Sequence, residues 1–242
     1  RTDAIFGPFI DKYTIRQAEH DGAVVPIFYE GRTAKGAVAG GSDLDELFED
    51  MFAEHTTEEV EKLKARYATT GAVLEAPKLI AAKAKSILWH YVSTVLPGGF
   101  KAQLSATSRL ATVRYREALL TARDELVAQI ERLPEYLVRG AEDGSLDIDG
   151  LDRRRQVLVR ALPHLELIRI LDFVPVISGD HNDDPAWAQW TDKGRQDKVI
   201  AEFKQPLGLP GEHTSPVAFL LVRTMLLTGF DAPVEQALYL DR

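Results

Sequence analysis

The pattern of hydrophobic and polar positions divides most of the chain into alternating strands and helices. Short apolar runs at residues 218–222 and 237–240, and a mixed run at 100–105, predict strands. Two longer stretches have apolar positions every three or four residues, which predicts helices that begin at Pro77 and after Thr107 or Ser108. The inward positions are Ile80, Ala84, Ile87, Tyr91 and Val95 in the first helix and Ala111, Tyr115, Leu119, Ala122, Leu126 and Ile130 in the second. This order of helix, strand and helix predicts an α/β fold with a parallel sheet.

Weaker patterns complete this assignment. Residues 23–29 are rich in β-formers and predict a strand, which Pro26 would confine to an edge. An acidic helix is expected from Ser42, and a second helix is expected behind a cap at Thr56 or Thr57. Residues 133–167 predict a helical excursion from the sheet, 168–178 a strand interrupted at Pro175, and 192–203 a helix.

Length and composition restrict the class of protein. With 242 residues and 45% hydrophobic content, the chain is long enough to bury one sizeable core. No apolar run approaches the ~20 residues that cross a bilayer, and no secretory leader opens the sequence. The absence of cysteine excludes disulfides and fits a reducing compartment, so we expect a cytoplasmic protein. Because the chain begins at Arg1 and ends just after a predicted strand, we expect a piece of a longer protein.

The net charge of −8 argues against a protein that coats DNA. Its distribution weakens that argument, because residues 43–61 hold nine acidic side chains and no Lys or Arg. A protein that tracks along DNA needs only a narrow basic path.

The turn behind the strand at 218–222 is the first candidate site. Ligands of open parallel sheets collect at the carboxyl ends of strands, so Thr224, Thr228, Gly229 and Asp231 are placed to contact a nucleotide or a phosphate backbone. Gly229 permits backbone geometry that a side chain would resist. The alternative is an ordinary turn between strands in which Asp231 only caps.

Three polar clusters are further candidates. Thr107, Ser108 and Arg109 open a helix and suit phosphate oxygens, although Ser108 or Thr107 could simply cap that helix. Three arginines at positions 153–155 could contact phosphates or could form a solvated helix start. Residues 180–184, DHNDD, offer carboxylates for a cation, but a turn whose side chains bond their own backbone is the favoured interpretation, and no metal site is assigned.

Four blocks carry a resemblance to a known family. The segment LLTGFDAPVEQALYLDR at 226–242 resembles the motif V region in the second motor domain of type I restriction enzyme R subunits, which are superfamily-two DNA translocases. Three further blocks follow that family in order: FGPFIDKYTIRQAEHDGAVVPIFYEGR at 6–32, FKAQLSATSRLATVRYREAL at 100–119, and VISGDHNDDP at 176–185. Only the motif V block is specific enough to carry the assignment.

The resemblance implies a RecA-like parallel sheet flanked by helices. Residues 1–22 would end the first motor domain or link to it, and residues 23–242 would form the second, which stops before motif VI. Gly229 and Asp231 would contact ATP, with Asp231 on a ribose hydroxyl. The DNA contacts would come from Thr107, Ser108, Arg109, Thr224 and Thr228. No catalytic residue is assigned.

The same resemblance implies which cofactors and partners the protein has. ATP and Mg²⁺ would serve the intact subunit, whose other partners would be double-stranded DNA, the first motor domain and the modification and specificity subunits. The chain has no GxxxxGK[ST] loop, so we expect it to hold neither cofactor firmly alone and to hydrolyse no ATP alone. Two alternatives stay open: the motor domain of another superfamily-two helicase, and a noncatalytic α/β interaction module.

Overall fold

The computed structural model describes residues 13–25, 28–31 and 75–241, and the chain divides into two compact units, Arg1–Thr33 and Ala34–Arg242. In the first unit, α2 (Ile15–His20) begins with a capping box between Thr14 and Gln17. The strand predicted over 23–29 is wrong for the described residues of that range, which form no strand. Val25 is 79% exposed and Phe28 90% exposed, so these β-formers have no packed surface to lie on. The helices predicted from Ser42 to residue 74 lie outside the described residues.

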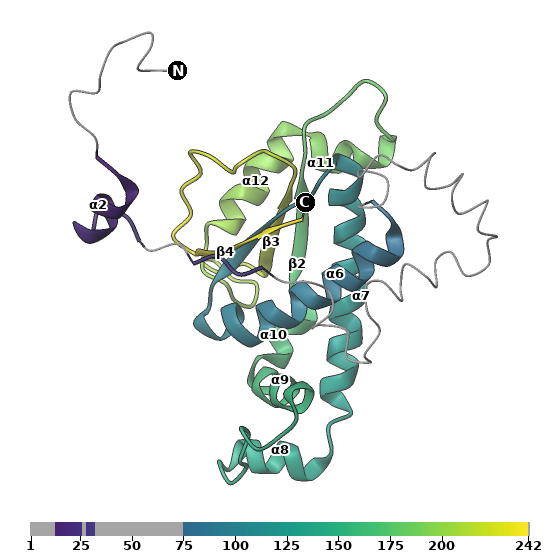
Figure 1. Cartoon of the computed structure of the whole chain (residues 1–242). Helices are drawn as coiled ribbons and strands as arrows, with labels where there is room; N and C mark the ends of the chain where they lie inside the picture. The colour runs from purple at the N-terminus through teal and green to yellow at the C-terminus, as the bar shows by residue number, and fades with distance from the viewer. Residues whose placement is uncertain (1–12, 26–27, 32–74, 242) are drawn as a thin grey trace, which may run out of the picture. The chain divides into compact units, whose positions relative to one another are not determined.

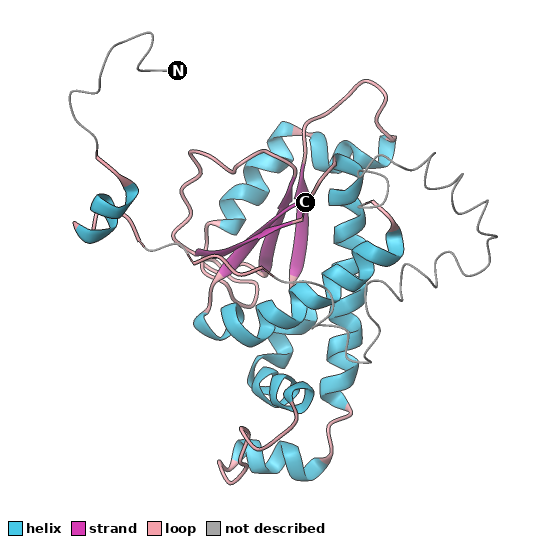
Figure 2. Cartoon of the chain, viewed as in Figure 1, coloured by secondary structure: helices cyan, strands magenta, loops and turns pink. Residues whose placement is uncertain are grey.

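The second unit contains a parallel sheet, which confirms the predicted α/β class and is consistent with a RecA-like fold. Its strands are β1 (Lys101–Ser105), β2 (Asp172–Val176), β3 (Val217–Val222) and β4 (Glu235–Leu240). They lie in the order β2-β3-β1-β4, and every pairing is parallel (Figure 2). The central strands β1 and β3 are buried along their whole length.

One face of the sheet packs against α6 (Pro77–His90) and α7 (Arg109–Glu131). As predicted, Pro77 opens α6 and Ser108 caps α7, accepting a hydrogen bond from the backbone of Ala111. The helical path of α6 continues through η2 (Tyr91–Val95) and η3 (Leu96–Gly98) and ends at Gly99, whose φ is 74°. The predicted inward positions of α7 are all buried: Ala111, Tyr115, Leu119, Ala122, Leu126 and Ile130.

The other face is covered by a second apolar cluster. It joins Val174, Val176, Leu220 and Val222 of the sheet to Phe203 at the end of α12 (Lys193–Phe203). Asp192 caps α12, which confirms the helix predicted over 192–203. Before it lie η5 (Pro185–Trp187) and α11 (Ala188–Thr191).

The predicted excursion over 133–167 is helical and consists of α8 (Glu135–Glu142), α9 (Arg153–Ala161), η4 (Leu162–His164) and α10 (Leu165–Ile170). In Figure 1, α8 and α9 lie away from the sheet, near the far end of α7. The strand predicted from residue 168 begins only at Asp172, because Ile168 is buried on a face of α10. Pro175 lies within β2, at an edge of the described sheet, as its missing N–H requires. No described helix is both long and apolar enough to cross a membrane.

Candidate functional site

The loops that follow β1, β2 and β3 start at the same edge of the sheet. Val222 ends β3 and pairs in register with Ser105 on one side and with Val176 on the other. The backbone N–H of Ala106 donates to the Val222 carbonyl at 2.8 Å, and Ser105 Oγ donates to the Arg223 carbonyl at 2.9 Å. The structure therefore holds the segment that leads into α7 against the start of the loop after β3, as expected for parallel strands.

The start of α7 supplies three of the candidate residues. Ser108 Oγ accepts from the Ala111 N–H at 3.0 Å, so this hydroxyl already caps the helix. The Oγ1 atom of Thr107 is buried and has no hydrogen-bond partner in the structure. Unpaired buried polar atoms are costly, and both Thr107 Oγ1 and Arg109 Nε have unused hydrogen-bonding capacity here.

Arg109 is held within the protein. Its guanidinium group is bound to the Asp183 carboxylate, lies 3.9 Å from Asp180 and stands 5.5 Å from the ring centre of Trp187. Hydrogen bonding to Arg109 lowers the pKa of Asp183 below its usual value. A phosphate contact by Arg109 would have to compete with Asp183.

The DHNDD segment forms the turn that the sequence favoured. The N–H of Asp180 donates to Asp183 at 2.7 Å, and the N–H of Ala186 donates to Asp184 at 2.8 Å. Within the described ranges, no cluster of three or more His, Asp or Glu side chains could hold a metal ion. The acidic side chains of this segment provide turn contacts and a counter-ion for Arg109.

The loop after β3 does not keep its residues at one edge of the sheet. It leaves the carboxyl end of β3, and because β4 runs parallel to β1, it must return to the amino end before Glu235. There the Val234 carbonyl accepts from the N–H of Lys101, the first residue of β1, at 2.7 Å. Thr224 therefore lies two residues beyond the carboxyl end of β3, whereas Asp231 comes later in the loop, three residues before Val234.

Apolar side chains fix this loop to the sheet. Met225, Leu226, Leu227, Phe230 and Ala232 pack against the second apolar cluster. Phe230 lies 6.2 Å from Phe203 between ring centres. Between these anchors, the four candidates are exposed: Thr224, Thr228, Gly229 and Asp231. No described residue donates a hydrogen bond to the Asp231 side chain, so its carboxylate is available to a ligand.

Gly229 has a left-handed backbone with φ of 69°, and a Cβ there would meet nothing within 4 Å. The requirement for glycine is therefore conformational rather than steric. Leu226 also has positive φ, at 61°, a geometry that is costly for a side chain and is maintained by its packing. The exposed polar residues thus lie on a fixed loop.

Sequence reasoning missed a buried polar cluster at the carboxyl end of β4. The Asp241 carboxylate accepts a hydrogen bond from Tyr115 Oη of α7 at 2.7 Å and is bound to Lys83 Nζ of α6. Burial, and then the charge of Asp241, raise the pKa of Tyr115. Asp241 lies 126 and 158 residues from these partners, so no local pattern could reveal the cluster.

A second missed feature lies at the amino end of β1. Lys101 is fully buried, and its Nζ donates to the Glu202 carbonyl at 3.3 Å. Burial lowers the pKa of Lys101 to about 8. Burial likewise raises the pKa of Glu235 to about 7, against the effect of a hydrogen bond with Gln103. Lys101, Gln103 and Ser105 alternate along β1 and give one face of this strand a polar character.

Comparison with known proteins adds two matches. The family model of the SWI2/SNF2 ATPases matches residues 1–61. The endonuclease subunit of the type I restriction enzyme HindI from Haemophilus influenzae is 25% identical over 244 residues. The chain is similar to that subunit. The match covers 100% of this chain but only 18% of the relative's length, and no solved structure matches. The two matches are thus to a family of ATPases and to the endonuclease subunit of a restriction enzyme.

Proposed function

We propose that this chain forms the second motor domain of an ATP-dependent DNA translocase, the R subunit of a type I restriction enzyme. One observation carries the proposal: a parallel sheet whose central strand β3 leads directly into an apolar-anchored loop that exposes Thr224, Thr228, Gly229 and Asp231. The name of the HindI relative supports the restriction class. The proposed activity of the intact subunit is ATP-driven movement along DNA followed by cleavage in another domain.

Asp231 is proposed to bind a ribose hydroxyl of ATP, with Gly229 beside it. An exposed carboxylate without a protein donor suits that contact. The residues of this chain do not fit the remainder of the nucleotide, because the sequence lacks the GxxxxGK[ST] loop that holds phosphates and magnesium. The first motor domain of the same subunit would supply those groups.

The proposed DNA contacts are Thr107, Ser108, Arg109, Thr224 and Thr228. The first three and Thr224 belong to neighbouring loops at the carboxyl edge of the sheet, which supports one continuous contact. Modification and specificity subunits are the proposed protein partners, and the cytoplasm is the proposed location.

The ribose contact is tested in the intact protein by comparing ATP with its 2′-deoxy and 3′-deoxy analogues. We expect the wild-type protein to hydrolyse ATP with a lower KM than one of these analogues, and Asp231→Ala to remove that difference. Asp197→Ala removes another exposed carboxylate, from α12, and should keep the difference. An unchanged preference in Asp231→Ala would contradict the assignment.

A second candidate is the motor of another DNA-dependent ATPase, and the SWI2/SNF2 match over residues 1–61 favours it. The two candidates differ in nuclease chemistry. Cleavage of DNA by the intact protein in the presence of ATP supports the restriction class, whereas DNA-stimulated ATP hydrolysis without any cleavage supports the alternative.

A further inference from the structure

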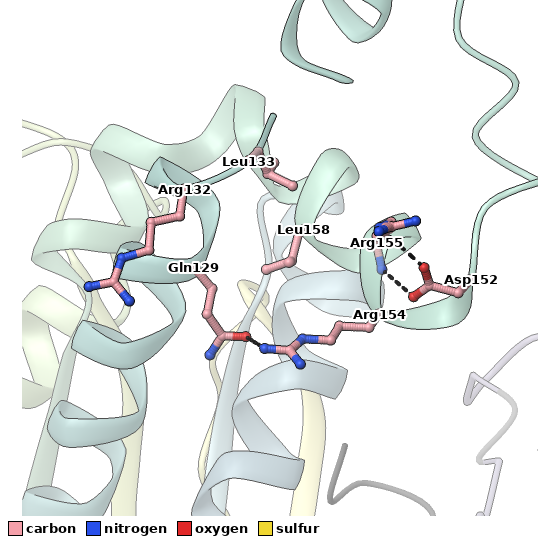
Figure 3. A pocket seen from close by; sticks show the side chains of 7 residues that line it. All are labelled: Gln129, Arg132, Leu133, Asp152, Arg154, Arg155 and Leu158. Carbon is pink, nitrogen blue, oxygen red and sulfur yellow. Dashed lines mark hydrogen bonds and ion pairs between the residues drawn. The ribbon is translucent and has the colours of Figure 1, made fainter. Parts of the chain in front are cut away.

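A hollow of about 440 Å³ lies between the end of α7 and the start of α9, outside the loops described above. Leu133 and the buried Leu158 give it apolar walls, and Arg132, Arg154 and Arg155 are among the residues that line it (Figure 3). A hollow with apolar walls and a cationic surround is unusual in a chain whose net charge is −8.

The charges around the hollow are largely uncompensated. Arg154 is held by the neutral amide of Gln129 at 2.7 Å, so its side chain is positioned without losing its charge. Arg132 forms no ion pair with any residue that the structure describes. Arg155 lies 3.4 Å from Asp152, but both side chains are half exposed, and such pairs are weak. Three cations therefore face one carboxylate.

Three other arginines of the excursion form ion pairs of their own. Arg139 binds Glu135 at 2.5 Å, Arg160 binds Asp149 at 2.7 Å and Arg169 binds Glu131 at 2.6 Å.

Residues 153–155 occupy the first turn of α9, and Asp152 caps this turn by accepting a hydrogen bond from the Arg155 N–H at 3.0 Å. The single carboxylate of Asp152 thus serves both the helix end and the neighbouring guanidinium groups. An anion bound at the hollow would offset the remaining guanidinium charge.

We propose that this hollow docks the phosphate backbone of DNA; the inference rests on the proposed function, which makes DNA the partner of the motor. Figure 3 shows the Arg132 guanidinium on the opposite side of the hollow from Arg154 and Arg155, so the three groups do not converge on one point. Guanidinium groups spread in this way match successive phosphates of a strand better than one small anion. The helical excursion thereby becomes a second DNA contact of the domain.

The test measures binding of a fluorescently labelled duplex to the intact protein without ATP, by anisotropy at several salt concentrations. The variant Arg132→Gln/Arg154→Gln/Arg155→Gln should bind at least about tenfold more weakly, and the slope of log K against log salt should fall by about two to three. The matched control Arg139→Gln/Arg160→Gln/Arg169→Gln removes the same charge from the same excursion and should bind within about twofold of the wild type. Circular dichroism verifies that both variants keep the fold.

Equal weakening in the two triple variants, or none in either, would overturn the proposal. Displacement of the duplex by inorganic phosphate beyond the effect of chloride at equal ionic strength would also overturn it, by assigning the hollow to a small anion. If instead the motor proposal is wrong, the wild-type protein will show no ATP-driven movement along DNA. The two triple variants would still differ in DNA binding, so the two failures can be distinguished.

Discussion

The guanidinium group of Arg109, the first residue of α7, is bound to the carboxylate of Asp183 in the loop that follows β2. β1 and β2 are not neighbours, because β3 lies between them. This ion pair therefore connects the start of α7 with the loop after β2, although β3 lies between their strands. The Arg109 side chain, which is expected to contact DNA, therefore also links two segments at the carboxyl edge of the sheet.

The Arg109–Asp183 pair predicts a specific acid response. Asp183 has a lowered pKa in the folded chain, so its contribution to stability is present above its unfolded pKa of about 3.9 and is lost as pH falls through the lower folded pKa. Asp183→Asn should reduce stability near neutral pH and narrow its difference from the wild type below about pH 4. Urea unfolding at pH 3 to 7 measures this, and a difference that stays constant with pH would contradict it.

The cluster at Asp241 should contribute strongly to stability. Asp241→Ala leaves Lys83 and Tyr115 without their partner in a buried place, with an expected loss of about 3 kcal/mol. Tyr115→Phe removes one hydrogen bond and should cost about 1–2 kcal/mol. Lys85 pairs with Glu125 on the surface, so Lys85→Met is the control and should change stability by less than about 1 kcal/mol. Denaturant unfolding checks these values, and equal effects in all three variants would refute the assignment.

Lys101 predicts a response at alkaline pH. Its folded pKa of about 8 lies below the unfolded value of about 10.4, so between these values the unfolded chain binds more protons and stability rises with pH. The gain should be on the order of 2 kcal/mol from pH 8 to 10.5, and Lys101→Met should lack it. The decisive quantity is the difference in unfolding free energy between wild type and variant, because other groups titrate equally in both. A difference independent of pH would show that Lys101 stays charged.

Gly229 predicts a conformational cost. Gly229→Ala places a side chain at φ of 69° and should destabilise the chain by about 1–2 kcal/mol, although the space around it is open. Gly194 in α12 has no positive φ, so Gly194→Ala is the control and should stabilise by about 0.5 kcal/mol. Thermal unfolding measures both, and a neutral Gly229→Ala would mean that the loop relaxes without strain.

The elements that the sequence predicted well are those whose signal is local. The inward face of α7 is defined by six apolar residues at helical spacing, and its start by Ser108, so packing and propensity agree there. The continuous apolar run of β3 likewise requires cover on both faces. Val25, Phe28 and Tyr29 are β-formers too, but they are exposed, and composition alone could not separate the two cases.

The features that the sequence did not reveal depend on the topology of the sheet. Because β4 runs parallel to β1 and β3, the loop that contains Asp231 must return to the amino end of the sheet, and no local pattern in residues 223–234 indicates this. The partners of Asp241 and the compensation of Arg109 by Asp183 join segments that are distant in sequence. The sequence showed Arg154 and Arg155 as part of a basic run. It gave no sign that Arg132, which directly follows α7, lines the same hollow.

The central claim is that this domain belongs to a motor that moves along DNA and uses Asp231 to bind ATP. The most direct measurement follows displacement of a triplex-forming oligonucleotide from linear duplex DNA by the intact protein, with its partner subunits and a recognition site present. The account predicts displacement that requires ATP and Mg²⁺, is lost or slowed at least about tenfold in Asp231→Ala, and is retained in Asp197→Ala. Absence of ATP-dependent displacement in the wild type, or displacement by Asp231→Ala at the wild-type rate, would contradict it.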